Sequence, residues 1–471
     1  MERFMRLWMQ WWGLVKQLRP ACSRKRTFLW MVAVVAAMSV RGDLAGVTSF
    51  VRALGLGSSC YERLLGVFHS DALSLEKLTG QWVALVFRCV PGLLRINGRH
   101  VLVGDGIKVA KSGRKMPAVK RLHQESESNT KPEFIMGHSI QAVSVLAQGL
   151  SSVFAIPLSA RIHEGVVFNN NDKRTLLDKM ILLLNSLCVE HPCYFVADAY
   201  YAAAKIIHGL LAAGNHLVSR VKKNAVAFEP FSEPEGRKQR GRPRKYGRKI
   251  KLSSLFDLAG NMEELESPVY GEKGVKIQIA SYDLLWRNVG LLVRFVVAIH
   301  PSRGRILLMC TDLSLSAIEI LKLYSLRFKI ELSFKQALHV IGAYGYHFWM
   351  ARMEPLKRNS GNQHLHRKDQ EYRDGIRRKM KAYHVHMQLG CIAQGMLHYL
   401  SMRFPELVWS SFGSWIRTVR PGLCPSENVT SIALRNTLAN FLGEAPPGVE
   451  IVSFLRDRLD LERIEGTRLA A

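Results

Sequence analysis

The sequence predicts an α/β protein with an all-α N-terminal region, and two observations support this prediction. Residues 1–95 carry apolar side chains at helical spacing, as with Trp8, Trp11 and Leu18 in the first segment. From residue 100 onward, apolar runs of strand length alternate with amphipathic segments of helical period. A chain of 471 residues can bury a full core and divide into two or three domains.

The elements expected after residue 100 follow a defined order. Strands are predicted at 101–109, 134–147 and 150–162, followed by a helix at 173–187 and a strand at 194–197. A helix at 201–213 and a strand at 216–221 complete the series. This is the order of the ribonuclease H-like fold, in which the first and fourth strands lie side by side. Asp105 and Asp198 end the apolar runs of those two strands, so this fold brings their carboxylates together.

Further elements are expected toward the C-terminus. Two apolar strands are predicted at 289–299 and 306–310, followed by a long helix at 316–341. A polar basic connection at 351–381 then leads to another helix at 383–402. The long helix carries Glu331. The sequence beyond Pro421 gives no comparable signal.

The charge balance indicates a polyanionic partner. The chain has 66 Lys and Arg against 38 Asp and Glu, a formal net charge of +28, and an isoelectric point near 10.0. Basic side chains that neutralise phosphates release condensed counterions, which favours binding to nucleic acid. The alternative is a merely basic surface, as in ribosomal-type proteins.

The cysteines favour a reducing compartment, which we take to be the cytoplasm. All eight are scattered, without a Cys-x2-Cys pair, so neither a disulfide framework nor a zinc ribbon is indicated. Cys188, His191 and Cys193 lie close together, but no second ligand pair at zinc spacing accompanies them.

One segment imitates a membrane span. Thr27 to Val40 is apolar for 14 residues before Arg41 and Asp43 interrupt it. A span needs about 20 apolar residues, and no convincing signal-peptide cleavage site follows. We interpret the segment as a buried helix and expect no membrane association.

Three acidic residues occupy positions that suit metal chemistry. Asp105 and Asp198 end two predicted strands, and Glu331 lies on a predicted helix. Such a trio can hold two divalent ions, and oxygen ligands favour Mg²⁺ or Mn²⁺. An isolated Asp or Glu is usually a turn or surface residue, so this hypothesis depends on the three being placed together.

The predicted helix carries a spaced motif. Tyr324, Arg327 and Glu331 are at i, i+3 and i+7, on one helix face, so Arg327 can brace a phosphate or the glutamate. The segment YSLRFKIE resembles the Tyr-x2-Arg-x3-Glu motif of DDE transposases of bacterial insertion sequences. VLVGDGIKVAKSGRKM and YFVADAYYAA resemble the blocks that hold this group's two aspartates. The group's motif continues to a lysine where this chain has Leu338, and Lys335 is the nearest basic residue on that face. We expect Lys335 to take over the phosphate contact of that lysine, with a missing contact as the alternative, and Tyr324 and Arg327 to bind DNA phosphates beside it.

The resemblance implies a function and a domain organisation. It implies that Asp105, Asp198 and Glu331 bind two Mg²⁺ or Mn²⁺ ions and catalyse cleavage of element ends and strand transfer into target DNA. The partners implied are double-stranded DNA and a second copy in a homodimeric active complex, in the cytoplasm at the nucleoid. The alternative is a catalytically inactive DNA-binding protein derived from a transposase. The expected regions are a helical DNA-binding region at 1–95 and the first part of the catalytic core at 96–221. A basic β-rich insertion at 222–290, the rest of the core at 291–402 and a C-terminal tail at 403–471 follow.

Two further segments suggest contacts with DNA. Residues 42–68 resemble a helix-turn-helix, with an ordinary helical bundle as the alternative. Residues 240–247, RGRPRKYG, resemble an AT-hook, with a solvated basic loop as the alternative. The basic residues that carry this second hypothesis are Arg240, Arg242, Arg244 and Lys245. Trp286 either stacks on a displaced base or packs in the core, and we favour the core.

Overall fold

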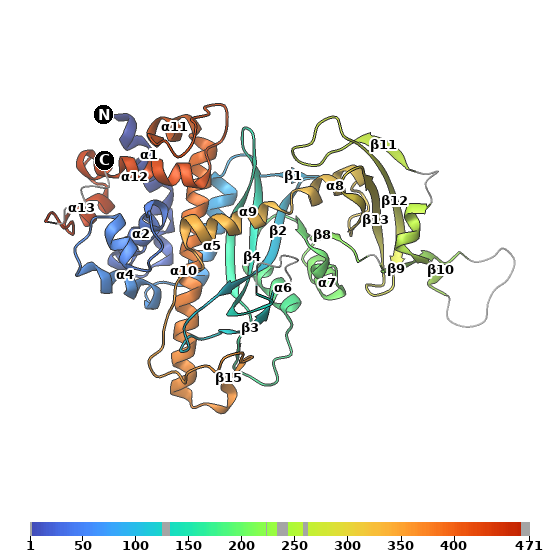
Figure 1. Ribbon diagram of the computed structural model, residues 1–471, viewed down its shortest axis with the longest axis horizontal. Helices are drawn as coiled ribbons and strands as arrows, with labels where there is room; N and C mark the ends of the chain where they lie inside the picture. The colour runs from blue at the N-terminus through green and yellow to red at the C-terminus, as the bar shows by residue number, and fades with distance from the viewer. Residues whose placement is uncertain (1, 125–131, 223, 233–243, 258–261, 463–471) are drawn as a thin grey trace.

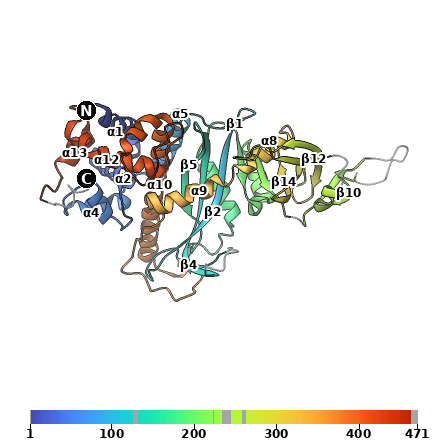
Figure 2. The same ribbon diagram turned by 45° about the horizontal axis from the view of Figure 1, so that its top comes forward.

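In the computed structural model, a helical part, a central sheet and a β-rich part follow one another along the long axis of the molecule (Figures 1 and 2). The structure describes residues 2–124, 132–222, 224–232, 244–257 and 262–462. The first and the last described helices both lie in the helical part, so the chain leaves this part, builds the sheet and returns (Figure 1).

The central sheet contains the predicted strands in the predicted order. Its strands are β2 (Arg99–Ala110), β4 (Phe134–Gln148), β5 (Val153–Ile162), β7 (Cys193–Ala197) and β8 (His216–Arg220). In space they run β5-β4-β2-β7-β8, with β2 antiparallel to β4 and parallel to β7. The predicted pairing of the first and fourth strands is therefore confirmed. Between these strands lie the helices α6 (Leu176–Ser186) and α7 (Ala204–Ala212).

The sheet continues without interruption into the β-rich part. The additional strands are β9 (Val226–Pro230), β10 (Tyr246–Lys251), β11 (Glu263–Glu266), β12 (Lys276–Trp286), β13 (Leu291–His300) and β14 (Gly304–Cys310). β14 pairs antiparallel with β8, and β13 and β12 follow on its outer side. Trp286 is buried against Phe295, 6.0 Å between ring centroids, so it packs in the core as we favoured.

Short strands complete the sheets of the described residues. They are β1 (Arg95–Ile96), β3 (Lys120–His123), β6 (Val166–Val167) and β15 (Gln363–His364). β1 and β3 pair with β2 and β4, whereas β6 and β15 form a separate parallel pair.

The N-terminal region is helical, and helices from the C-terminal end pack into it. Its helices are α1 (Glu2–Val15), α2 (Lys25–Val40), α3 (Thr48–Ala53), α4 (Cys60–His69) and α5 (Leu75–Cys89). The C-terminal end adds α11 (Pro405–Phe412), α12 (Glu427–Glu444) and α13 (Glu450–Arg456). Trp8 stacks on Phe441 at 5.3 Å and donates its indole N–H to the carbonyl oxygen of Leu434. The helices α11, α12 and α13 thus pack with the N-terminal helices, an arrangement that the sequence did not reveal.

The apolar segment predicted to be a buried helix is α2. Every residue from Phe28 to Val40 is buried, because α2 is covered by neighbouring helices that include α4, α12, α13 and the long helix α10 (Gln370–Arg403). In the described part of the chain, no helix is both long and apolar enough to cross a bilayer.

The predicted basic connection at 351–381 is wrong in its second half. The helix α10 (Gln370–Arg403) begins 13 residues before the predicted start at 383. Asp369 caps its N-terminus by accepting a hydrogen bond of 2.7 Å from the backbone N–H of Tyr372. The first turns project beyond the bundle (Figure 1) and are mostly polar, so Tyr372, Ile376 and Met380 form only a narrow apolar stripe among charged residues.

The long helix α10 joins the helical part to the sheet. Its Gln388 side-chain oxygen accepts hydrogen bonds from Thr79 of α5, from Ser159 of β5 and from Arg161. These buried polar groups satisfy one another, which avoids the cost of leaving one unpaired. The contact holds the sheet against the helices at a fixed position.

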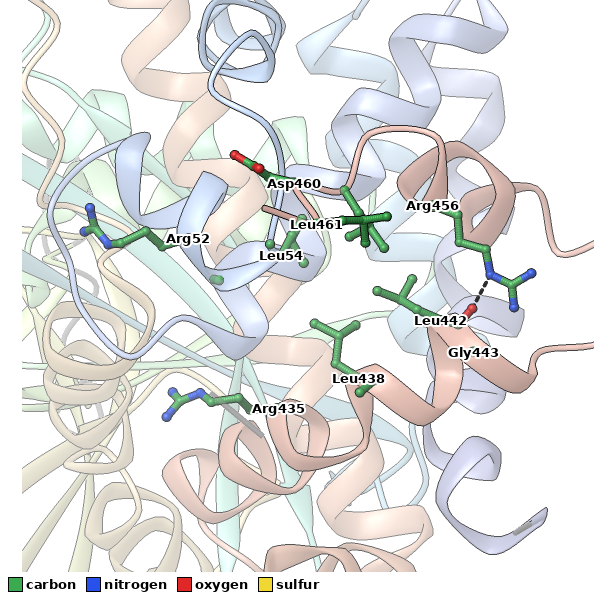
Figure 3. A pocket seen from close by; sticks show the side chains of 13 residues that line it. Arg52, Leu54, Arg435, Leu438, Leu442, Gly443, Arg456, Asp460 and Leu461 are labelled. Carbon is green, nitrogen blue, oxygen red and sulfur yellow. Dashed lines mark hydrogen bonds between the residues drawn. The ribbon is translucent and has the colours of Figure 1, made fainter. Parts of the chain in front are cut away.

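The segment that resembles a helix-turn-helix forms two helices, α3 and α4, joined by a turn. Gly55, at φ 62°, ends α3. The C-terminal segment covers this turn, since the N–H of Gly57 donates to the oxygen of Arg458 and the N–H of Asp460 donates to the oxygen of Gly55. Beside it lies an apolar hollow of about 480 Å³ between α3, α12 and the chain end (Figure 3).

Candidate active site

The two aspartates lie on neighbouring strands, at the point where β7 ends beside β2. Asp105 is on β2, and Asp198 directly follows β7, which is parallel to β2 with Val103 opposite Val196. The Asp198 carboxylate caps a short 3₁₀ helix by accepting a 3.0 Å hydrogen bond from the N–H of Tyr200. The strand pairing therefore fixes both residues from the backbone.

Gly104 allows this close arrangement. A Cβ atom at this position would come within 2.4 Å of the Phe195 ring on the neighbouring strand. The glycine before Asp105 is therefore required for packing between β2 and β7, which explains its place in the apolar run.

The pKa of Asp105 is raised from its ordinary value of 3.8 to about 6. Burial of the carboxyl group is the main cause, and repulsion by Asp198 adds to it. A hydrogen bond from the N–H of Gly106, at 2.7 Å, and the charge of Arg327 oppose the shift. Two carboxylates are thus held close enough to repel, a situation that a bound cation relieves.

Arg327 bridges Asp105 and Glu331. One guanidinium nitrogen donates to Asp105 Oδ2 at 3.0 Å, and the other donates to Glu331 Oε1 at 2.5 Å. The side chains of Arg327 and Asp105 are 19% and 20% exposed, whereas Glu331 is 55% exposed. Arg327 therefore links Asp105 and Glu331, and Asp198 is close enough to Asp105 to raise its pKa.

The predicted continuous helix at 316–341 is wrong. The structure has α8 (Ala317–Ser325), a turn at 326–328, α9 (Lys329–Gln336) and one π-helical turn (Ala337–Ile341). Across the break, the N–H of Arg327 bonds to Tyr324 and that of Glu331 bonds to Phe328, an i→i−3 pattern that tightens the chain. Arg327 and Glu331 nevertheless stay together.

Tyr324 contacts this arginine and not the carboxylates. It is half-buried, and its phenol interacts with Arg327. Burial raises the pKa of Tyr324, so it stays a neutral hydroxyl. We assign it to support of Arg327.

The donor set fits a hard divalent cation, although no group of three metal-ligating side chains is assembled in the described residues. Asp105 and Asp198 repel each other, and Glu331 also raises the pKa of Asp105. The Arg327 guanidinium lies where positive charge is needed. Carboxylate oxygens are the ligands that Mg²⁺ and Mn²⁺ prefer.

Comparison with known proteins identifies the family. A family model described as DDE superfamily endonuclease matches residues 17–271, more than half of the chain. The chain belongs to the DDE superfamily endonucleases. The matched range contains Asp105 and Asp198 and ends before Glu331.

Two solved structures show a weak likeness to this endonuclease. A piggyBac transposase synaptic complex with hairpin DNA aligns with a TM-score of 0.35 at 11% identity, covering 94% of this chain and 78% of that chain. The NurA nuclease from Sulfolobus solfataricus aligns with a TM-score of 0.23 at 10% identity, covering 58% and 86%. These scores are too low to support an argument about function. No curated protein matches the sequence.

The basic residues predicted around the site of the endonuclease differ in their placement. Lys335 is exposed on α9, one turn after Glu331, whereas Leu338 is half-buried against the core. Arg240 and Arg242 lie outside the described residues. Arg244 is exposed, and the Lys245 ammonium donates to the carbonyl oxygen of Gly290.

Sequence reasoning missed the basic groups on the two sides of the site. Next to Asp198, a pocket of about 780 Å³ is lined by Tyr200, Lys222, Lys249, Trp286 and Arg287, among others. A second pocket of about 340 Å³ is lined by Arg220, Arg303, Tyr324 and Arg327, among others. The only available signal was positional, since Arg220 ends the strand β8 beside β7.

Proposed function

We propose that this endonuclease is the transposase of a bacterial insertion sequence, with Asp105, Asp198 and Glu331 as its catalytic residues. The observation that carries the proposal is the position of the three acids relative to one another. The adjacent parallel strands β2 and β7 place Asp105 and Asp198 next to each other, and Arg327 forms ion pairs with both Asp105 and Glu331. The Tyr324, Arg327 and Glu331 motif supports the same assignment.

The proposed architecture is a ribonuclease H-like catalytic core. The strand order β5-β4-β2-β7-β8, with β4 antiparallel to its neighbours, supports this assignment. We propose the region boundaries given above, with the helical DNA-binding region first and the basic β-rich insertion between the two parts of the core.

The three carboxylates would hold two Mg²⁺ or Mn²⁺ ions, which when bound activate the attacking oxygen and stabilise the leaving oxygen. Asp105 and Asp198 would ligate these ions where β7 ends beside β2, and Glu331 would complete the ligand set from α9. Water attacks the phosphorus, and the bond to the 3′ oxygen breaks. The freed 3′-hydroxyl then attacks a phosphate of target DNA.

The partners proposed are double-stranded DNA of the element ends and of the target, together with a second copy of the chain in a homodimeric complex. The net charge of +28 supports DNA as the partner. The proposed location is the cytoplasm, at the nucleoid.

Purified protein and the DNA that flanks its own gene provide the test. We expect short inverted repeats on both sides of the coding region. We also expect Mg²⁺-dependent cleavage at their outer ends, followed by joining to a second duplex. Binding without cleavage at any divalent metal concentration would instead favour the inactive DNA-binding alternative.

We expect Arg240, Arg242 and Arg244, each changed to Gln, to flatten the salt dependence of DNA binding. Three lost phosphate contacts lower the slope of log K against log salt by up to roughly 2.7, at about 0.9 per contact. Lys245 is kept because it bonds to Gly290. Fluorescence anisotropy across a salt series measures the slope.

The control for that experiment changes Arg248 and Lys276 to Gln on the same insertion. Their charges are already paired with Glu229 and Glu264, at 2.7 and 2.8 Å. An equal change of slope in both variants would show that the 240–244 residues hold no phosphate.

We expect Lys335→Ala to slow strand transfer by about tenfold without loss of stability. Lys335 is exposed one turn beyond Glu331, and exposed substitutions usually change the free energy of unfolding by less than about 0.5 kcal/mol. Lys322→Ala, an exposed lysine on α8, is the control. Equal rates for the two variants in single-turnover strand transfer would leave Lys335 without a role.

A further inference from the structure

The loop between α11 and α12 exposes an apolar and basic surface at residues 413–423, here called the 413–423 surface. Trp415 is fully exposed, and Ile416 and Val419 are 67% and 49% exposed. Arg417 lies between Ile416 and Val419, Arg420 follows Val419, and both arginines are also exposed. A soluble protein rarely leaves a tryptophan and an isoleucine side by side in water without a partner.

Hydrogen bonds fix both ends of this loop to the helices, and the exposed side chains lie in its middle. Gly413, in the left-handed region, ends α11, and the amide of Asn436 donates to the oxygen of Phe412 at 2.6 Å. At the other end, the indole of Trp409 donates to the oxygen of Leu423 at 2.8 Å. The fold therefore presents the loop at a fixed place.

That place is joined to the candidate active site. Cys424, directly after the surface, forms two hydrogen bonds with the tip of the β4–β5 hairpin. Its sulfur accepts from the N–H of Leu150, and its own N–H donates to the hydroxyl of Ser151. Tyr270 reaches the Ser151 oxygen and packs on Phe328, which is next to Arg327 in the chain. In Figure 1 the loop after α11 reaches toward the hairpin between the helical part and the sheet.

The positive charge of the loop indicates that its partner is negatively charged. No Asp or Glu occurs from 407 to 426, while Arg417 and Arg420 are both exposed. The flanking Glu427 is buried and paired with His398 at 2.7 Å, so it does not neutralise the surface. A basic surface with an exposed aromatic ring fits a phosphate backbone and the apolar floor of a groove.

We propose that the 413–423 surface binds duplex DNA, with Arg417 and Arg420 on phosphates and Trp415 against the groove. The proposal rests on the proposed function as a transposase. It adds a DNA contact on the C-terminal helices, outside the regions for which DNA contact was expected from the sequence.

Tryptophan quenching tests the proposal directly. Seven of the nine tryptophans are buried, and the other exposed one is Trp349, 64% exposed. In the Trp349→Phe protein, quenching by acrylamide reports on Trp415. In EDTA, a duplex carrying the element end is expected to reduce the accessible fraction by more than about fivefold, at a concentration where anisotropy shows saturation.

The outcomes separate the two proposals. If anisotropy shows no DNA binding at all, the proposed function fails. If DNA binds and Trp415 stays open to acrylamide, the loop proposal alone fails. If Trp415 becomes protected from acrylamide as the protein concentration rises, with or without DNA, a second copy of the chain covers the surface. That result would also overturn the proposal.

Charge substitutions give an independent measurement. Arg417→Gln with Arg420→Gln is expected to lower the slope of log K against log salt by roughly 1.8, at about 0.9 per contact. Trp415→Ala is expected to weaken binding about tenfold with the slope unchanged. The control, Lys357→Gln with Arg358→Gln, removes the same charge from exposed positions in the segment before α10, to which no DNA contact is assigned. An equal change in that control would show a general charge effect and overturn the proposal.

Discussion

Asp105→Ala, Asp198→Ala and Glu331→Ala are each expected to abolish DNA cleavage and strand transfer while leaving DNA binding within about threefold of the parent. Each carboxylate is a proposed metal ligand, so its loss removes several kcal/mol of transition-state stabilisation, or at least about a thousandfold in rate. Gel-based cleavage of an end-bearing duplex in Mg²⁺ measures the first quantity, and anisotropy in EDTA measures the second.

Glu319→Ala is the matched control for these variants. Glu319 is a carboxylate on α8 that caps its own helix with Ser316, away from Asp105. Its loss should lower stability slightly and leave cleavage unchanged. Normal strand transfer by any one of the three active-site variants would remove that residue from the triad.

The raised pKa of Asp105 adds a stability prediction. Its pKa rises from 3.8 to about 6 on folding, so the charged carboxylate destabilises the fold at pH values above about 6. This penalty is relieved as pH falls through 6 and is absent below about 4. The isosteric Asp105→Asn variant should therefore melt at a higher temperature than the parent at pH 8, with no difference near pH 4.

This gain in stability with loss of cleavage distinguishes a functional carboxylate from a structural one. A structural aspartate held by favourable bonds has a lowered pKa, and its substitution by Asn would lower the melting temperature at pH 8. A lower melting temperature for Asp105→Asn would therefore contradict the active-site assignment.

The sequence predicted the strands that place the aspartates because their apolar runs are short and continuous. VLVGD and CYFVAD are each a buried apolar run ended by an acid, and the order of elements between them was sufficient to pair β2 with β7. Only Asp198 follows the end of its strand, because β2 continues past Asp105 to Ala110. Local pattern is informative there because the strands are buried in the middle of the sheet.

The break between α8 and α9 could not be predicted because the apolar spacing continues through it. Leu326 and Ile330 are buried on both sides of the turn, so the pattern is that of one helix. The i→i−3 hydrogen bonds at 326–331 accompany a contact between Arg327 and Asp105, 222 residues apart in sequence. Such a tertiary contact overrides local preference and leaves no periodic signal.

The C-terminal helices escaped prediction for a related reason. α12 is buried on much of its surface, from Val429 to Leu442, between α1, α2, α10 and α11. A helix enclosed on several sides has no single apolar stripe, and small and polar residues such as Thr430 and Thr437 fill its close contacts.

Arg327→Lys is expected to slow cleavage by about ten- to a hundredfold, although the charge is kept. The Arg327 guanidinium spans Asp105 and Glu331 with two separate nitrogens, at 3.0 and 2.5 Å. An ammonium group is a single point of charge and cannot hold two carboxylates in this planar arrangement. Single-turnover cleavage in Mg²⁺ measures the effect.

The structure offers a matched control in Arg294. This arginine also holds a carboxylate with two nitrogens, at 2.8 and 2.7 Å from Asp283, on the β12–β13 hairpin. Arg294→Lys should lower the melting temperature and leave the rate of cleavage unchanged. Equal losses of activity in the two variants would assign Arg327 to structure alone.

Arg327→Gln separates the two tasks of the arginine. Between Asp105 and Glu331 its positive charge lies where a metal ion is needed, so its removal should strengthen binding of Mn²⁺ to the DNA-free protein. A unit charge at about 4 Å contributes up to about 4 kcal/mol at an effective dielectric of 20, so at least a fivefold change is expected in calorimetry. Cleavage should nevertheless fall, because the phosphate loses its planar donor. Weaker binding of Mn²⁺ by Arg327→Gln would show that the arginine organises the carboxylates for the ion and does not take its place.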